Sequence, residues 1–116
     1  MRHLAIVAGL IALVVSTDNC GAATLYTGND MIEGCRMFLQ PDSGHDTLAQ
    51  AFSQGQCIGA VRAVAEVERL VCPPKDAPIS QGIRIVLQYL DNHPARLHET
   101  FSLLASEALR AGWPCR

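Results

Sequence analysis

The sequence predicts an all-α fold, a small disulfide-tied bundle of four main helices. Apolar residues recur at helical spacing in four segments, and stretches rich in proline or glycine separate these segments. Of the five cysteines, four lie beyond a predicted signal peptide, an even number that suits a small exported domain. Such a domain buries too little apolar surface to be stable through its core alone, and disulfides offset this shortfall.

The predicted signal peptide covers residues 1–23 and leaves one domain, residues 24–116. Met1–His3 is a basic start, Leu4–Val15 is an apolar run, and small residues follow, so we expect cleavage after Ala22 or Ala23. The apolar run is too short to cross a hydrocarbon core of about 30 Å, which disfavours a stable membrane anchor. Polar rather than small residues precede Cys20, which disfavours lipid attachment. The sequence therefore predicts export to an oxidising compartment.

The first helix is expected over about residues 30–39. Asp30 and Glu33 have the i, i+3 spacing of a capping box. Apolar residues at helical spacing follow on one face, namely Met31, Ile32, Cys35, Phe38 and Leu39. Residues 40–46 contain proline, serine and glycine, so the helix should end before them.

The second helix is expected to be the longest, from Thr47 to about Leu70. Thr47 and Gln50 form another capping box, and the segment contains no proline. Its apolar residues cover two flanks, with Phe52, Gly59, Ala63, Val67 and Leu70 on one and Ile58, Val61 and Ala65 on the other. Because only a narrow strip remains polar, we expect this helix to be central and covered by several neighbours. Small residues, Gly55 and Gly59 with Ala60 and Ala63, suit the close approach of another helix.

A stiff loop is expected next, over residues 72–78. Its three prolines remove backbone donors and restrict the residues that precede them. Ser80 is then expected to cap a third helix, which ends at His93-Pro94. The apolar stripe of this helix consists of Ile83, Val86, Leu87 and Leu90. Tyr89 neighbours the stripe and should pack on the core with its hydroxyl in water.

The fourth helix is expected over about residues 100–111. The residues expected to be buried are Leu104, Ala105, Ala108 and Leu109. Gly112 stands where a left-handed C-terminal cap is expected. Trp113 should then fold back over the last helical turn.

The cysteines beyond the signal peptide, Cys35, Cys57, Cys72 and Cys115, allow three pairings, and spacing alone does not choose among them. An antiparallel arrangement of the first two helices would bring Cys35, late in one, near Cys57, early in the other. Cys72 and Cys115 each follow a helix end. We therefore favour Cys35–Cys57 and Cys72–Cys115 and leave the other pairings open. Each disulfide would contribute roughly 3 to 4 kcal/mol of stability.

Charge and motifs argue against several function classes. The net charge is −2 with no basic stripe, so we expect neither nucleic acid nor an anionic membrane surface as a partner. Cysteines held in disulfides are not nucleophiles, and the common hydrolase, phosphate-loop and zinc-protease motifs are absent. His45, His93 and His98 lack the close ligand pairs of zinc frameworks, and His93 is better explained as a cation at a helix C-terminus. The scattered acidic residues indicate a solvated surface; they are Glu66, Glu68, Glu99 and Glu107. We predict no catalytic residue, metal ion or cofactor.

Several motifs, taken together and in order, are similar to those of one family. They are Tyr26-Thr27-Gly28-Asn29-Asp30 leading to Cys35, Cys57-Ile58-Gly59, Cys72-Pro73, Ser80-Gln81-Gly82, Tyr89-Leu90, His93-Pro94 and Trp113-Pro114-Cys115. The chain thereby resembles the Rap/Tai family of type VI secretion amidase immunity proteins over essentially all of residues 24–116. It departs from the family pattern in the order of Gln81 and Gly82 and over residues 96–99.

The resemblance implies a periplasmic, all-helical homodimer that binds a cell-wall amidase effector, blocks its active site and is not itself an enzyme. Lys75, Asp76 and Ala77 are our candidate partner-binding residues, because a stiff, tethered loop loses little entropy on binding. The alternative role of this loop is only to connect two helices. The alternative function is that of a periplasmic binding or chaperone-like protein of the same fold without a toxin partner. A small enzyme acting through cysteine or histidine is a further alternative.

Overall fold

A computed structural model describes residues 26–40 and 47–116 of the chain. In this part the chain forms α1 (Gly28–Leu39), α2 (Leu48–Val67), α3 (Ile79–Asn92), the short 3-10 helix η1 (Pro94–Arg96) and α4 (Phe101–Gly112). The prediction of a four-helix, all-α fold is thus confirmed. The predicted signal peptide and residues 41–46 lie outside the described residues. None of the described helices combines the length and the apolar character that crossing a bilayer requires.

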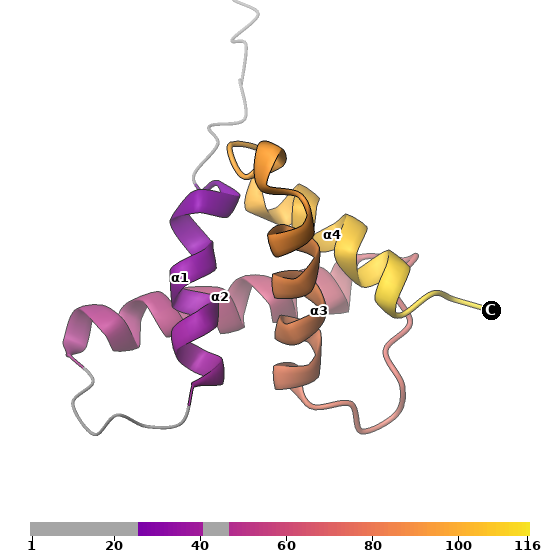
Figure 1. Ribbon diagram of the computed structural model, residues 1–116. Helices are drawn as coiled ribbons and strands as arrows, with labels where there is room; N and C mark the ends of the chain where they lie inside the picture. The colour runs from indigo at the N-terminus through magenta and orange to yellow at the C-terminus, as the bar shows by residue number, and fades with distance from the viewer. Residues whose placement is uncertain (1–25, 41–46) are drawn as a thin grey trace, which may run out of the picture.

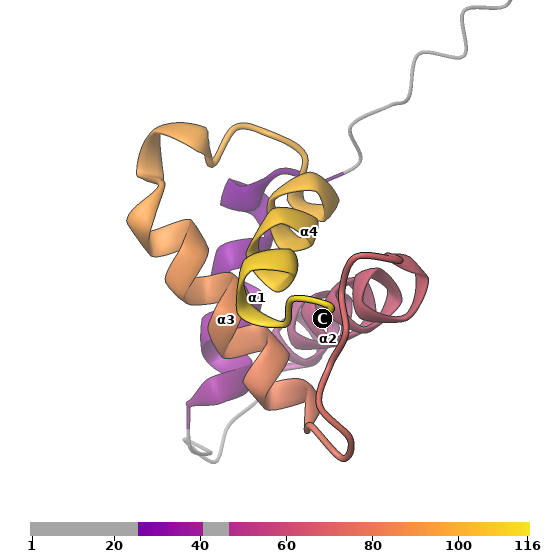
Figure 2. The same ribbon diagram turned by 90° about the vertical axis from the view of Figure 1, so that its right-hand side faces the viewer.

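The helices form two layers, with α2 on one side and α1, α3 and α4 on the other. In Figure 1, α2 runs horizontally behind α1 and α3, which stand side by side, while α4 slopes across the upper right. Figure 2 shows α2 nearly end on, with the other three helices gathered on one side of it. The helix α2 contacts α1, α3 and α4, and α3 also packs on both α1 and α4.

Capping explains where the helices begin. The expected box of Asp30 and Glu33 is wrong, because Thr27 is the N-cap and α1 begins at Gly28. The Thr27 hydroxyl accepts a hydrogen bond from the Asp30 amide, and the Asp30 carboxylate accepts one from the Thr27 amide. The box that begins at Thr47 is confirmed. Ser80 does not cap α3, since the N-cap there is Pro78 and the helix begins one residue before the serine.

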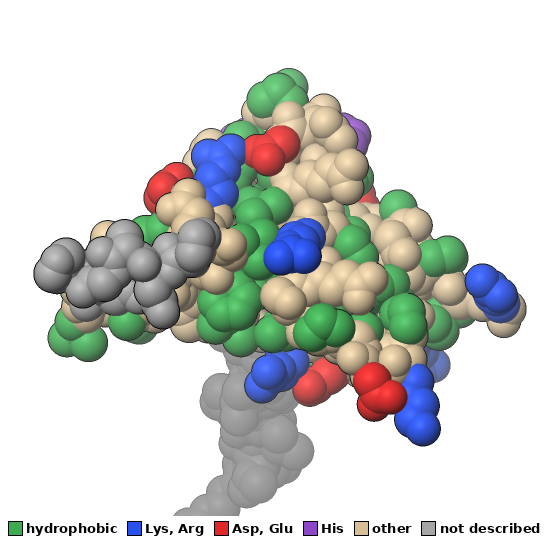
Figure 3. All heavy atoms as spheres, turned by 60° about the horizontal axis from the view of Figure 1, so that its bottom comes forward, with side chains coloured by type: hydrophobic (Ala, Val, Ile, Leu, Met, Phe, Trp, Pro, Cys, Tyr) green, Lys and Arg blue, Asp and Glu red, His purple; other side chains and the backbone are tan. Residues whose placement is uncertain are grey.

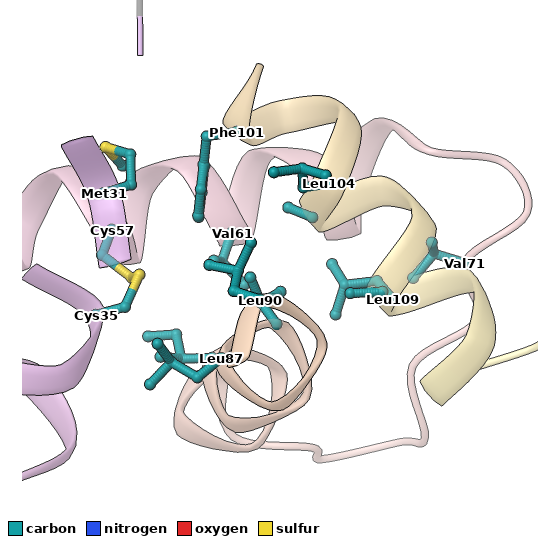
Figure 4. Packing of buried hydrophobic residues seen from close by; sticks show 14 of the residues in the cluster. Met31, Cys35, Cys57, Val61, Val71, Leu87, Leu90, Phe101, Leu104 and Leu109 are labelled. Carbon is teal, nitrogen blue, oxygen red and sulfur yellow. A yellow bond between two sulfur atoms is a disulfide. The ribbon is translucent and has the colours of Figure 1, made fainter. Parts of the chain in front are cut away.

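The core lies between the two layers and contains the predicted stripes of α3 and α4. Its fully buried side chains include Ile83, Val86, Leu90, Leu104 and Leu109. Figure 4 shows these elements meeting around Val61 of α2, with Phe101 and the Cys35–Cys57 disulfide to one side. Fully burying one aliphatic side chain of this size contributes roughly 1.5 to 3 kcal/mol. This apolar contact therefore stabilises the packing of the two layers on each other.

The expectation that α2 is covered around most of its circumference is wrong. Of its residues only Cys57 and Val61 are buried. The flank of Ile58, Val61 and Ala65 packs on the core. The other flank is exposed, because no described helix lies on that side of α2 (Figure 2).

Both disulfides join the favoured partners. Cys35 of α1 is bonded to Cys57 of α2, with their Cα atoms 5.2 Å apart and both residues fully buried. Cys72 is bonded to Cys115, with Cα atoms 5.0 Å apart, and both of these residues are exposed. The first disulfide joins the two layers within the core, and the second ties the chain's C-terminal end to the segment that follows α2.

Gly112 does not form the expected left-handed cap. It is the last residue of α4, and Trp113 is the C-cap with a φ of −128°. A Cβ atom at Gly112 would lie 2.6 Å from Cγ2 of Ile85, so a larger residue would displace that side chain. The glycine thus allows the end of α4 to approach α3 closely.

Candidate partner-binding surface

The candidate residues Lys75, Asp76 and Ala77 lie in the connection between α2 and α3, residues 68–78. Lys75 and Asp76 are exposed, whereas Ala77 is half-buried and packs against the core. In Figure 1 this connection descends at the right of the molecule and reaches the lower end of α3. The structure therefore places two charged side chains at the tip of the loop and an anchor directly after them.

The tip is a hydrogen-bonded turn. The amide of Ala77 donates to the carbonyl oxygen of Pro74 at 3.1 Å, which closes a four-residue turn around Lys75 and Asp76. Asp76 has a φ of +64°, the left-handed region that aspartate tolerates better than most residues. Pro73, Pro74 and Pro78 fix their own φ angles near −65°. The tip accordingly has few alternative backbone conformations.

Three contacts fix the base of the loop to the end of α4. Cys72 is bonded to Cys115, and the amide of Cys72 donates to the carbonyl oxygen of Trp113 at 2.8 Å. Val71 forms an isolated antiparallel bridge with Pro114 and is itself buried. The expected stiff loop is thus held covalently and by backbone hydrogen bonding.

Trp113 is buried beside the loop. Its ring lies against α3, where a Cβ atom at Gly82 would come within 2.9 Å of Cη2 of the indole. Glycine at position 82 therefore leaves room for the ring. A shallow hollow of about 190 Å³ lies next to it, lined by Arg62, Ala65, Glu66, Pro73, Ala77, Ile79 and Trp113. This hollow adjoins the loop and could receive a small side chain of a partner.

A polar cluster at η1, α3 and α4 was missed in the sequence. Arg96 donates to both carboxylate oxygens of Glu99, at 2.8 and 2.7 Å, and to those of Glu107, at 2.6 and 3.1 Å. The hydroxyl of Tyr89 donates to Glu107 and accepts from Arg96. The expectation of a Tyr89 hydroxyl in water is therefore wrong, because its α3 position faces Glu107 of α4.

The cluster shifts the pKa values of its members. Hydrogen bonds from Arg96 and then Tyr89 lower the pKa of Glu107 to about 2. The hydrogen bonds of Arg96 also lower the pKa of Glu99. The pKa of Tyr89 is raised, because ionisation would lose the hydrogen bond to Glu107. None of these groups changes its charge near neutral pH. The cluster therefore serves as a structural clamp that holds the connection between α3 and α4 in place.

Glu68 forms a second clamp at the end of α2. One of its carboxylate oxygens accepts from Arg110 at 2.7 Å and from the Ser106 hydroxyl at 2.8 Å, and the other accepts from the amide of Leu70. These contacts, Arg110 first, lower the pKa of Glu68 to about 2. The prediction that the acidic residues are merely solvated is thus wrong for Glu68, Glu99 and Glu107.

The remaining candidates show the following geometry. The ring of His93 stacks on Tyr89 with centroids 4.1 Å apart, and its Nδ1 lies 2.7 Å from the carbonyl oxygen of Tyr89, so His93 caps the end of α3 as a polar group. Residues 26–40 and 47–116 contain no group of three or more metal-ligating side chains. His45 lies outside the described residues. On the face drawn in Figure 3, basic and acidic side chains are scattered between hydrophobic ones.

Comparison with known proteins gives one family. A family model described as Rap1a immunity proteins matches residues 27–115, from the N-cap of α1 to the last cysteine. Neither the comparison with curated proteins nor that with solved structures gives a match.

Proposed function

Because the chain belongs to the Rap1a immunity protein family, we propose that it is a periplasmic immunity protein that binds and inhibits a peptidoglycan amidase effector of type VI secretion. It acts by contact rather than by catalysis, and it works as a homodimer. The signal peptide of residues 1–23 directs its export. The two disulfides are compatible with an oxidising compartment, where such bonds persist.

The main support for this proposal is the loop tip of Lys75, Asp76 and Ala77. We propose that this tip enters the substrate cleft of the amidase. Its base is fixed by the Cys72–Cys115 disulfide, and its turn is closed by a backbone hydrogen bond. A loop that is already ordered loses little conformational entropy when it binds, and this favours tight inhibition. The exposed ammonium and carboxylate at the tip supply polar groups that a cleft shaped for peptide substrates can pair.

The test is a titration of the oxidised protein into the amidase encoded next to its gene. Heat of binding and release of cleaved peptidoglycan fragments are followed in the same samples. We expect saturable binding with loss of cleavage at one immunity protomer per enzyme. Absence of binding would overturn the proposal and favour a periplasmic binding or chaperone-like protein of the same fold.

A matched pair of variants tests the role of the loop. Lys75 and Arg84 are both exposed basic residues, one at the loop tip and one on α3. Lys75→Glu should weaken inhibition at least tenfold, which corresponds to about 1.4 kcal/mol. Arg84→Glu makes the same change of charge and should leave inhibition unaltered. Equal effects of the two variants would show that overall charge matters and that the loop does not enter the cleft.

A further inference from the structure

The outward face of α2 carries an apolar strip that no described element covers. We name it the α2 stripe and define it as Phe52, Gly55, Gly59, Ala63 and Val67 of the helix together with Leu70 of the turn that follows. Phe52 is 64% exposed, Val67 77% and Leu70 58%. No atom would lie within 4 Å of a Cβ atom placed at Gly55 or Gly59. Figure 2 shows that one side of α2 faces away from the other helices.

This exposure is concentrated rather than scattered. Six large hydrophobic residues are exposed in the described part of the chain, and four of them, Leu48, Phe52, Val67 and Leu70, lie on α2 or in the turn that follows it. Single exposed hydrophobic residues are ordinary on a protein surface. Four that are each more than half exposed along α2 and the turn after it leave on the order of 400 Å² of apolar area, which is the size of a functional patch.

The stripe is complementary to itself. Its residues are separated by 3, 4, 4, 4 and 3 positions, and this order reads the same in both directions. Two antiparallel copies related by a two-fold axis can therefore pair the four central members, which all lie on α2, as an isologous interface requires, and this brings Phe52 toward the turn that holds Leu70 of the partner subunit. In that register Gly59 faces Ala63 of the partner subunit and Gly55 faces Val67 of the partner subunit.

The sizes of the side chains fit the same register. The smallest pair lies at the centre, where two crossing helices are closest, and the largest pair lies at the ends, where they diverge. Val67 of the partner subunit would occupy the open space over Gly55. On the rim, Gln56 would meet Glu66 of the partner subunit, where an amide can donate to a carboxylate.

We propose that the α2 stripe is the surface on which a second copy of this chain docks, antiparallel and about a two-fold axis level with Val61. The proposed function includes a homodimer but assigns no surface to it. This inference rests on the proposed function only for the existence of that dimer. The three large side chains of each copy would bury on the order of 600 Å² together, and the helix backbone with the polar rim brings the total to about 1,000 Å², the range of weak, reversible interfaces. A weak, reversible dimer is therefore expected.

Sedimentation of the oxidised protein over about 1 to 200 µM tests the surface, because a weak dimer changes its association state with protein concentration. The wild type should change from monomer to dimer. Val67→Glu and Gly55→Lys should each raise the dissociation constant at least thirtyfold. Leu103→Asp, which changes a large side chain that is 48% exposed on α4, should leave it unaltered. Circular dichroism of each variant checks that the fold is retained, as these positions are exposed.

Mixing the two stripe variants tests the register. In the mixed dimer the lysine at position 55 faces the glutamate at position 67 of the other copy, so a heterodimer should recover much of the wild-type affinity. Failure of the mixture to associate would overturn the antiparallel register, and a wild type that stays monomeric would overturn the proposal. A stripe variant that loses amidase binding while the wild type is monomeric would instead assign the stripe to the effector. A wild-type dimer that does not inhibit the amidase would leave the stripe proposal standing and refute only the proposed function.

Discussion

Replacement of Gly34 by alanine should destabilise the protein at the crossing of α1 and α2. A Cβ atom there would lie 2.4 Å from the carbonyl oxygen and 2.8 Å from the carbonyl carbon of Ser53. Both are backbone atoms, so no side chain can rotate away. The Cys35–Cys57 disulfide, which begins at the next residue, prevents the helices from moving apart. Overpacking of this kind costs about 3 kcal/mol.

Alanine also gains about 1 kcal/mol over glycine in a helix, which leaves a net loss of about 2 kcal/mol. For a domain of this size that corresponds to a fall in Tm of roughly 8 to 16 °C. Gly55→Ala is the matched control, because it has the same gain and no neighbour within 4 Å. Measured by thermal circular dichroism of dilute protein, its Tm should rise. A Gly34→Ala protein as stable as the wild type would refute the packing argument.

Three further outcomes are expected. Cys72→Ser with Cys115→Ser removes an exposed disulfide with a sequence separation of 43; it should lower the free energy of unfolding in urea by about 4 kcal/mol, and a change below about 1 kcal/mol would contradict the loop-entropy model. Glu68 and Glu107 have native pKa values of about 2 against an ordinary 4.5, so their contribution to stability is complete above pH 4.5 and lost as the pH falls to about 2. Urea midpoints across this pH window should fall in the wild type and fall less in Glu107→Gln. Thr27→Ala removes the cap of α1 and should cost about 1 kcal/mol by the same assay, whereas an unchanged midpoint would show that the capping box contributes nothing.

The helices were predictable because their apolar periodicity is strong and proline or glycine separates them. The first residue of each helix was less predictable, since several polar residues near the start of a helix compete for the same backbone amides. Thr27 rather than Asp30 caps α1 because the chain before it is held by Phe101, whose amide donates to the carbonyl oxygen of Tyr26 at 2.9 Å. That contact joins the start of the described chain to the first residue of α4. No local pattern contains it.

The loop of the candidate site was predictable and the polar clusters were not. Three prolines and a cysteine predict a stiff loop over residues 72–78 from the sequence alone. Arg96, by contrast, lies 7 residues from Tyr89 and 11 from Glu107, and these three meet only because α3 and α4 pack together. One pair of the cluster did have a sequence signal, because Arg96 and Glu99 have the i, i+3 spacing of an ion pair.

The error about α2 has a different physical origin. A hydrophobic pattern indicates that one face of a helix is shielded from water. It does not indicate whether the same chain or another chain covers that face. Val61 and Val67 have the same side chain, yet one is fully buried and the other 77% exposed within a single chain. If the two-fold docking holds, the prediction of a helix covered on most sides is correct for the dimer and wrong only for the protomer. Gly55 and Gly59 then stay small to admit a second copy, just as Gly34 stays small to admit Ser53 of α2.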